Sequence, residues 1–185
     1  MSRTVSNMIP LGTIAPQFTL LDTITDKEVS LKDHRGEIGT VIYFICNHCP
    51  FVIHVNDELI RIGNDYSDKN ISFMAISSND VQNYPDDAPD LMRKKGLELN
   101  YPFPYLYDDS QEVAKVYDAA CTPDIYVFDG SLRLVYRGQL DDSRPDNGIL
   151  VTGNDLRHAI DCLVDGIKNT DVQKPSIGCN IKWKN

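Results

Sequence analysis

Two cysteines separated by two residues, Cys46 and Cys49, are the side chains in this sequence best suited to chemistry. Thiols at this spacing can close a small ring as a disulfide and reopen it by thiol–disulfide exchange. An apolar run at 40–45 precedes them, and a segment with helical spacing at 49–62 follows. The first turn of a helix has free N–H groups and a partial positive charge, which favour a thiolate over a thiol. The sequence therefore predicts a redox-active pair at a strand-to-helix junction.

The order in which the two thiols react is left open by the sequence. In disulfide exchange, Cys46 at the helix N-terminus is the expected first nucleophile, and Cys49 then resolves the mixed disulfide. In a thiol peroxidase, Cys49 attacks the peroxide, becomes a sulfenic acid and condenses with Cys46. A third alternative is a non-catalytic module that senses redox state. Zinc is disfavoured because a structural site usually takes four ligands, and only His48, His54 and remote Cys179 could complete one. We expect neither a metal nor a cofactor.

The two histidines near the pair have different expected roles. A protonated His48, between the cysteines, would stabilise the neighbouring thiolate and favour the reduced form. His54 lies further along the expected helix, where a structural role is expected.

The other cysteines and two arginines complete the set of candidates. Cys121 either lies close to the site or is a small buried apolar residue. Cys162 falls off the apolar face of the last expected helix and is expected to be inert. Cys179 is either a resolving thiol in the tail or a packing residue, and packing is slightly favoured. Alternate strand residues share a face, so Arg133 and Arg137 project the same way. One of them could bring a cation near the thiolate, but both are expected to be solvated surface charges.

The bulk properties limit the class of protein. A chain of 185 residues with a net charge of −9 is expected to be one domain, residues 1–185, with a C-terminal tail at 169–185. The negative charge argues against nucleic acid or an anionic membrane as partner. The N-terminus lacks the apolar stretch of a signal peptide and no apolar run reaches membrane-spanning length, so a cytoplasmic location is expected.

Periodicity and turn signals predict the elements that position the cysteines. Strands are expected at 12–22, 27–31, 40–45, 71–77, 124–129 and 133–137, and helices at 49–62, 87–95, 110–117 and 154–167. Asp26 marks the turn of an N-terminal hairpin, and Gly96 a helix end. Residues 102–107 are expected to be irregular, and the tail shows no periodicity. The order predicts an α/β fold with a mixed central sheet flanked by helices.

Motifs along most of the chain resemble one family. They are G-x-x-A-P-x-F-x-L at 12–20, Cys46-x-x-Cys49-Pro50, the segment 101–117 from Tyr-Pro-Phe-Pro to Tyr117, Thr122-Pro123-Asp124, residues 136–143, and the tail at 177–183. The combination resembles the redoxins, the peroxiredoxin (alkyl hydroperoxide reductase and thiol-specific antioxidant) branch of the thioredoxin fold, and within it a subgroup with a CxxC site.

This resemblance implies a thioredoxin-like α/β fold with an N-terminal hairpin extension and an oxidoreductase that maintains cell redox homeostasis. It implies that Thr122-Pro123 is a cis-proline loop facing the CxxC, so the expected catalytic residues are Cys46, Cys49, His48, Thr122 and Pro123. The implied partners are a protein or small-molecule disulfide, or a hydroperoxide, and a thiol reductant. A homodimer is an implied assembly state.

One departure from the family pattern bears on the choice between the two activities, which stays open. Peroxiredoxins have Pro and a Thr or Ser seven and three residues before the peroxide-attacking cysteine. If that cysteine is Cys49, those positions are Ile42 and Cys46 here. The hydroxyl that would bind peroxide is therefore replaced by a second thiol, which favours disulfide exchange over an antioxidant peroxidase.

Overall fold

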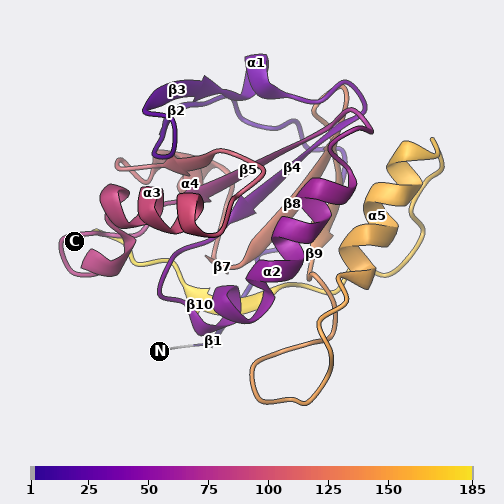
Figure 1. The fold of residues 1–185 in the computed structure, drawn as a ribbon. Coiled ribbons are helices and arrows are strands. Elements are labelled where there is room, and N and C mark those ends of the chain that lie inside the picture. Colours follow the sequence, from indigo (N-terminus) through magenta and orange to yellow (C-terminus); the bar gives the residue numbers. More distant parts are fainter. Residues whose placement is uncertain (1–2, 185) are drawn as a thin grey trace.

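Seven strands form the central sheet of the computed structural model, which describes residues 3–184 (Figure 1). Including the strands outside this sheet, the described strands are β1 (Arg3–Val5), β2 (Thr19–Asp22), β3 (Lys27–Ser30), β4 (Gly39–Phe44), β5 (Ile71–Ser77), β6 (Tyr105–Tyr107), β7 (Cys121–Thr122), β8 (Asp124–Asp129), β9 (Leu134–Gly138) and β10 (Ile177–Asn180). The helices are α1 (Leu31–His34), α2 (Pro50–Asp65), α3 (Pro89–Glu98), α4 (Glu112–Val116) and α5 (Asn154–Val164), with a 3₁₀ turn, η1, at Pro85–Asp87. The sheet order is β3-β2-β6-β5-β4-β8-β9.

The strand before the cysteines, β4, lies at the centre of this sheet. It is parallel to β5 and antiparallel to β8, so the sheet is mixed. Every residue of β4 is buried, and its side chains alternate between two apolar cores. Val41 and Tyr43 pack with α2, α3 and α5, whereas Ile42 and Phe44 pack with α1 and α4. Helices therefore cover both faces, which confirms the predicted α/β architecture.

The predicted hairpins are also present. β2 pairs with β3 as an antiparallel hairpin, and Asp26 in its turn has a φ of 60°. β8 pairs with β9 in the second hairpin. The peptide bond between Thr122 and Pro123 is cis, as the resemblance implies.

Some predicted boundaries are wrong, for reasons of tertiary packing. Residues 105–107, expected to be irregular, form β6 because β2 and β5 lie on either side of it. Gly96 does not end its helix: α3 continues to Glu98, and the Ile24 side chain occupies the space where a Cβ would lie. α5 ends at Val164, so Ile167 lies outside the helix and is mostly exposed.

The largest difference concerns the C-terminal tail, where no regular element was expected. Its residues 177–180 form β10, which pairs with β1 on one side and β7 on the other. A short strand without an apolar pattern is stable here because both neighbours satisfy its backbone hydrogen bonds. Gly178 is needed in this sheet, because a Cβ there would lie 1.9 Å from the Thr122 carbonyl oxygen. Among residues 3–184, no helix is long and apolar enough to cross a membrane.

Candidate functional site

The two cysteines of the CxxC motif lie between the end of β4 and the start of α2. Cys49 is the N-cap residue of α2, and Pro50 takes the first helical position, where its missing N–H costs nothing. Both side chains are buried, with Cys46 1% and Cys49 0% exposed. Figure 1 shows this end of α2 beside β10. The predicted strand–CxxC–helix arrangement is therefore present, although a substrate reaches either sulfur only if the surface opens locally.

Thr122 lies against both sulfur atoms. Cys46 Sγ is 3.5 Å from Thr122 Oγ1, and Cys49 Sγ is 3.1 Å from the Thr122 carbonyl oxygen. The cis Thr122-Pro123 bond follows directly. The structure thus brings together four of the predicted site residues, Cys46, Cys49, Thr122 and Pro123.

The surroundings of the two thiols differ in charge. The pKa of Cys49 is lowered to about 5, mainly by a hydrogen bond from Cys46. Burial opposes this shift, whereas smaller contributions from Cys179, Thr122 and the Val52 backbone N–H support it. The same hydrogen bond, burial and the nearby Asp87 carboxylate raise the pKa of Cys46 well above its ordinary value. The pair therefore shares one proton, which stays on Cys46 when Cys49 becomes a thiolate.

A buried carboxylate, Asp87, holds the residues between the cysteines. One oxygen accepts hydrogen bonds from the Asn47 and His48 backbone N–H groups, at 2.7 and 3.4 Å. The other lies 2.7 Å from His48 Nδ1 and accepts a bond from Asn79 Nδ2 at 2.7 Å. His48 also stacks on Tyr84, with ring centroids 5.5 Å apart. No sequence motif distinguishes Asp87 from its acidic neighbours, so sequence reasoning missed this role.

Two more side chains that the sequence did not identify bind Asn47. Lys95 Nζ donates to the Asn47 carbonyl oxygen at 2.8 Å, and Tyr105 donates to Asn47 Oδ1 at 3.2 Å. Burial lowers the pKa of Lys95, while Cys46 and Asp87 oppose that shift. Lys95 therefore brings a cation to the rim of the thiol pair.

Ligand atoms of Cys46, His48 and Asp87 lie within 4.8 Å of one another and could hold a metal ion. The Asp87 oxygens, however, already accept hydrogen bonds from Asn47, His48 and Asn79. A metal would have to displace several of these contacts, so the arrangement fits a braced dithiol better than a metal centre.

Cys179 lies in the same buried apolar cluster as Cys46 and Cys49. Its position in β10 is directly across from Thr122 of β7. Burial and a hydrogen bond with Cys49 raise its pKa to about 12. The tail thus brings a third thiol to the site. Of its neighbours in the tail, Ile181 is buried, whereas Trp183 is 42% exposed.

Cys121 combines the two roles that the sequence left open. It is fully buried and adjoins the site through Thr122, and its thiol contacts the Pro123 carbonyl oxygen at 3.6 Å. Burial raises its pKa well above the ordinary value.

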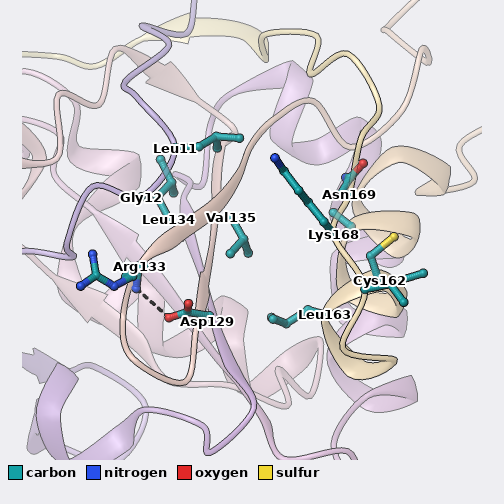
Figure 2. Close-up of a pocket in the computed structure, with 12 residues that line it drawn as sticks. Leu11, Gly12, Asp129, Arg133, Leu134, Val135, Cys162, Leu163, Lys168 and Asn169 are labelled. Carbon is teal, nitrogen blue, oxygen red and sulfur yellow. Dashed lines mark hydrogen bonds between the residues drawn. The ribbon is translucent and has the colours of Figure 1, made fainter.

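Cys162 lies in the wall of a cavity of about 330 Å³ between β9 and α5 (Figure 2). The prediction that Cys162 falls off the apolar face is wrong, because its side chain is only 4% exposed. The cavity shares no lining residue with the CxxC motif, Thr122 or Pro123, so it is separate from the thiol pair. Arg133 lines it, with its backbone N–H bonded to Asp129.

Arg137 is not a solvated surface charge, as was expected. It is fully buried, pairs with Asp124 at 3.1 Å and lies 4.4 Å from the centre of the Tyr126 ring. His54 lines a small hollow beside Pro123 and Arg144. Its Nε2 atom is buried without a hydrogen-bond partner among the described residues.

Comparisons with known proteins identify the family and the fold of the chain. Residues 11–137 match the family model described as AhpC/TSA family. A curated relative, Peroxiredoxin 2 of Picrophilus torridus, is 26% identical over 108 residues, which cover 58% of this chain and 52% of that protein. The match therefore spans about half the length of this relative.

Solved structures resemble most or all of the chain. An uncharacterized conserved protein from Geobacillus kaustophilus is 59% identical, with a TM-score of 0.98 over 100% of this chain and 97% of its own. A hypothetical protein from Sinorhizobium meliloti 1021 is 44% identical, with a TM-score of 0.95 over 98% of each chain. The thioredoxin domain of a thiol-disulfide oxidoreductase from Bacteroides vulgatus is 21% identical, with a TM-score of 0.66 over 85% of this chain and 99% of that domain. This last similarity shows the thioredoxin-like fold. The chain therefore belongs to the AhpC/TSA family, as a peroxiredoxin-like redoxin of thioredoxin fold.

Proposed function

We propose that this redoxin is a thiol–disulfide oxidoreductase that cycles Cys46 and Cys49 between dithiol and disulfide. The observation that carries the proposal is the meeting of both sulfur atoms at Thr122, within one buried cluster. Two thiols in this arrangement can deliver two electrons to one substrate disulfide and close their own disulfide. A thiol reductant is then needed to reopen it, which fits a reducing compartment such as the cytoplasm.

The reaction needs one thiolate and one resolving thiol. The thiolate attacks one sulfur of the substrate disulfide, a mixed disulfide forms, and the other substrate sulfur leaves as a thiolate that takes up a proton. The second cysteine then loses its proton and attacks the first cysteine's sulfur, releasing the remaining substrate thiolate. The pair is oxidised by two electrons, and the substrate disulfide is reduced to two thiols.

The charges around the pair favour a different order of attack from that expected from the sequence. Cys49 has the lower pKa, because Cys46 donates to it and because it caps α2. Asp87 disfavours negative charge on Cys46. We therefore assign the first attack to Cys49 and the resolving step to Cys46.

A second candidate, a thiol peroxidase, is favoured by the low pKa of Cys49. Cys49 would attack a peroxide oxygen, release an alcohol or water and become a sulfenic acid; Cys46 would then attack it, forming the disulfide and water. Against fast peroxide chemistry, Ile42 and Cys46 replace the proline and hydroxyl of the family pattern. In addition, Arg137 is paired with Asp124, so its charge is already neutralised there rather than directed at the thiolate.

Single-turnover reactions of the reduced protein with hydroxyethyl disulfide and with hydrogen peroxide test the two candidates. We expect the wild type to react readily with the disulfide, slowly with the peroxide, and to form Cys46–Cys49 in both cases. Cys46→Ser/Cys179→Ser, which lacks the other two thiols of the buried cluster around Cys49, should stop at a mixed disulfide on Cys49, detected by its added mass. Cys49→Ser should lose both reactions.

The Cys162→Ser variant is the matched control, because Cys162 is little exposed and remote from the pair. It should react as the wild type does. A mixed disulfide trapped on Cys46 in Cys49→Ser would reverse the order of attack. A wild type that reacts with neither substrate would refute both enzyme functions and favour a redox-sensing module.

A further inference from the structure

We propose that Cys179 is an alternative disulfide partner of Cys49, so that the redox centre contains three thiols. This inference deepens the proposed function and rests on it, since it assumes that Cys49 is the reactive sulfur. Cys179 lies on β10, a strand that the CxxC motif does not include.

The geometry around Thr122 brings the three thiols together. Cys46 contacts the Thr122 side chain, Cys49 contacts its carbonyl oxygen, and Cys179 is its partner in the β7–β10 ladder. Cys49 also acts electrostatically on Cys179 and helps to raise the pKa of its thiol. All three are within one buried cluster and at most 2% exposed, so they are shielded from outside thiols but not from each other.

Cys121 provides the contrast. It is equally buried and adjoins the same threonine, but its thiol contacts the Pro123 carbonyl oxygen. Cys49 acts on the Cys121 thiol only as a charge, whereas the hydrogen-bond contact of that thiol is with Pro123. The β10 register selects Cys179, and Gly178 permits β10 to approach the Thr122 carbonyl closely.

The oxidation state of Cys49 controls how reactive Cys179 is. In the reduced protein, burial and then the interactions with Cys49 raise the Cys179 pKa, so it is a hydrogen-bond donor rather than a nucleophile. When Cys49 is in a disulfide, it has no negative charge, and the part of the shift due to Cys49 disappears. Lys182 acts in the opposite direction and favours the Cys179 thiolate. Oxidation of the pair therefore makes the Cys179 thiolate easier to form, while burial, the largest cause of its raised pKa, still opposes it.

The proposed step is an internal disulfide exchange. Cys179 loses its proton and attacks Cys49 Sγ in the Cys46–Cys49 disulfide. The Cys49–Cys179 bond forms, the Cys46–Cys49 bond breaks, and Cys46 leaves as a thiolate that takes up the proton. No electrons enter or leave the protein. The result is an oxidised protein in which Cys46 is again a thiol.

Oxidation of full-length Cys46→Ser with diamide tests whether Cys179 reaches Cys49. We expect the Cys49 and Cys179 thiols to be lost together, and peptide mapping after acid quenching to show them joined. Cys46→Ser/Cys121→Ser should form the same bond, whereas Cys46→Ser/Cys179→Ser should keep Cys49 available for alkylation.

The wild type gives a second measurement that does not depend on the fold of a variant. Its singly oxidised form, quenched in acid and digested, should contain both Cys46–Cys49 and Cys49–Cys179 peptides. The proposal is overturned if the wild type contains Cys46–Cys49 alone, or if Cys49 in Cys46→Ser stays reduced or pairs with Cys121. A wild type that forms no Cys46–Cys49 bond would instead refute the proposed function. In that case, a Cys49–Cys179 bond in Cys46→Ser would still support Cys179 as a disulfide partner of Cys49.

Discussion

The carboxylate of Asp87 lies 2.7 Å from His48 Nδ1 and, through its other oxygen, 2.7 Å from the Asn47 backbone nitrogen. One buried side chain therefore fixes both residues between the two cysteines. Asp87 also places a negative charge next to His48 and near the Cys46 sulfur. This charge disfavours the Cys46 thiolate.

Asp87→Asn should lower the pKa of Cys46, because a negative charge near its sulfur is removed. It should also destabilise the reduced protein by about 2 kcal/mol, since buried hydrogen bonds to a charged group are lost. The rate of Cys46 alkylation against pH, measured in a Cys49→Ser background, reports the first effect, and urea unfolding reports the second. Asp86→Asn is the matched control, because Asp86 is exposed in the same turn. Equal effects of the two changes would contradict this role for Asp87.

The rate of Cys49 alkylation should rise with a midpoint near pH 5 and be almost independent of pH around neutrality. Cys46→Ala removes the largest cause of the low pKa and should move the midpoint toward the ordinary thiol value of 9.0. Iodoacetamide labelling followed by mass spectrometry measures both curves, with Cys162→Ala as control. A midpoint unchanged in Cys46→Ala would contradict the assignment of Cys46 as the main cause of the low pKa of Cys49.

The same shift makes the stability of the reduced protein depend on pH. The folded-state pKa of Cys49 is about 5, below its ordinary value of 9.0, so its contribution is complete above pH 9 and is lost as the pH falls through 5. Between those values, the free energy of unfolding should fall less steeply with decreasing pH in Cys49→Ala than in the wild type. Urea unfolding at a series of pH values measures the difference. Parallel curves for the two proteins would contradict a Cys49 thiolate in the fold.

His48→Ala should raise the midpoint of Cys49 alkylation, as the sequence predicts for a cation beside a thiolate. The rise should be smaller than that in Cys46→Ala, because the adjacent Asp87 offsets the charge of a protonated His48. Tyr84→Leu, which removes the stacked ring but no charge near the thiols, is the control. If His48→Ala leaves the titration curve unchanged, His48 is a structural residue of the turn.

Gly178→Ala should destabilise the protein by about 1–3 kcal/mol, because its Cβ would lie 1.9 Å from the Thr122 carbonyl oxygen and would push β10 from β7. Cys179 would move with the strand, so the Cys49–Cys179 disulfide should be lost while Cys46–Cys49 still forms. Gly12→Ala is the control, since an added Cβ there meets no atom within 4 Å and only its φ of 86° opposes the change. Wild-type stability of Gly178→Ala would show that this sheet can widen freely.

The sequence by itself determined the parts of this protein that depend on local pattern. A fully apolar run predicts β4, helical spacing after Cys49 predicts α2, and the motifs around Thr122-Pro123 indicate the loop that meets the cysteines. Hydrophobic period, capping position and motif spacing are all local properties of the chain, so they could be read without coordinates.

Only the tertiary structure decided which distant residues complete the site. Asp87 and Lys95 lie far from the CxxC motif in the sequence, and no local pattern marks them. Cys179 was a candidate from the sequence, but only the register of β10 places it across from Thr122. β10 exists because β1 and β7 satisfy its backbone, and the direction of the Cys46 and Cys49 pKa shifts follows from burial and neighbouring charge. These are properties of contacts between distant segments, which a linear pattern of residue types does not specify.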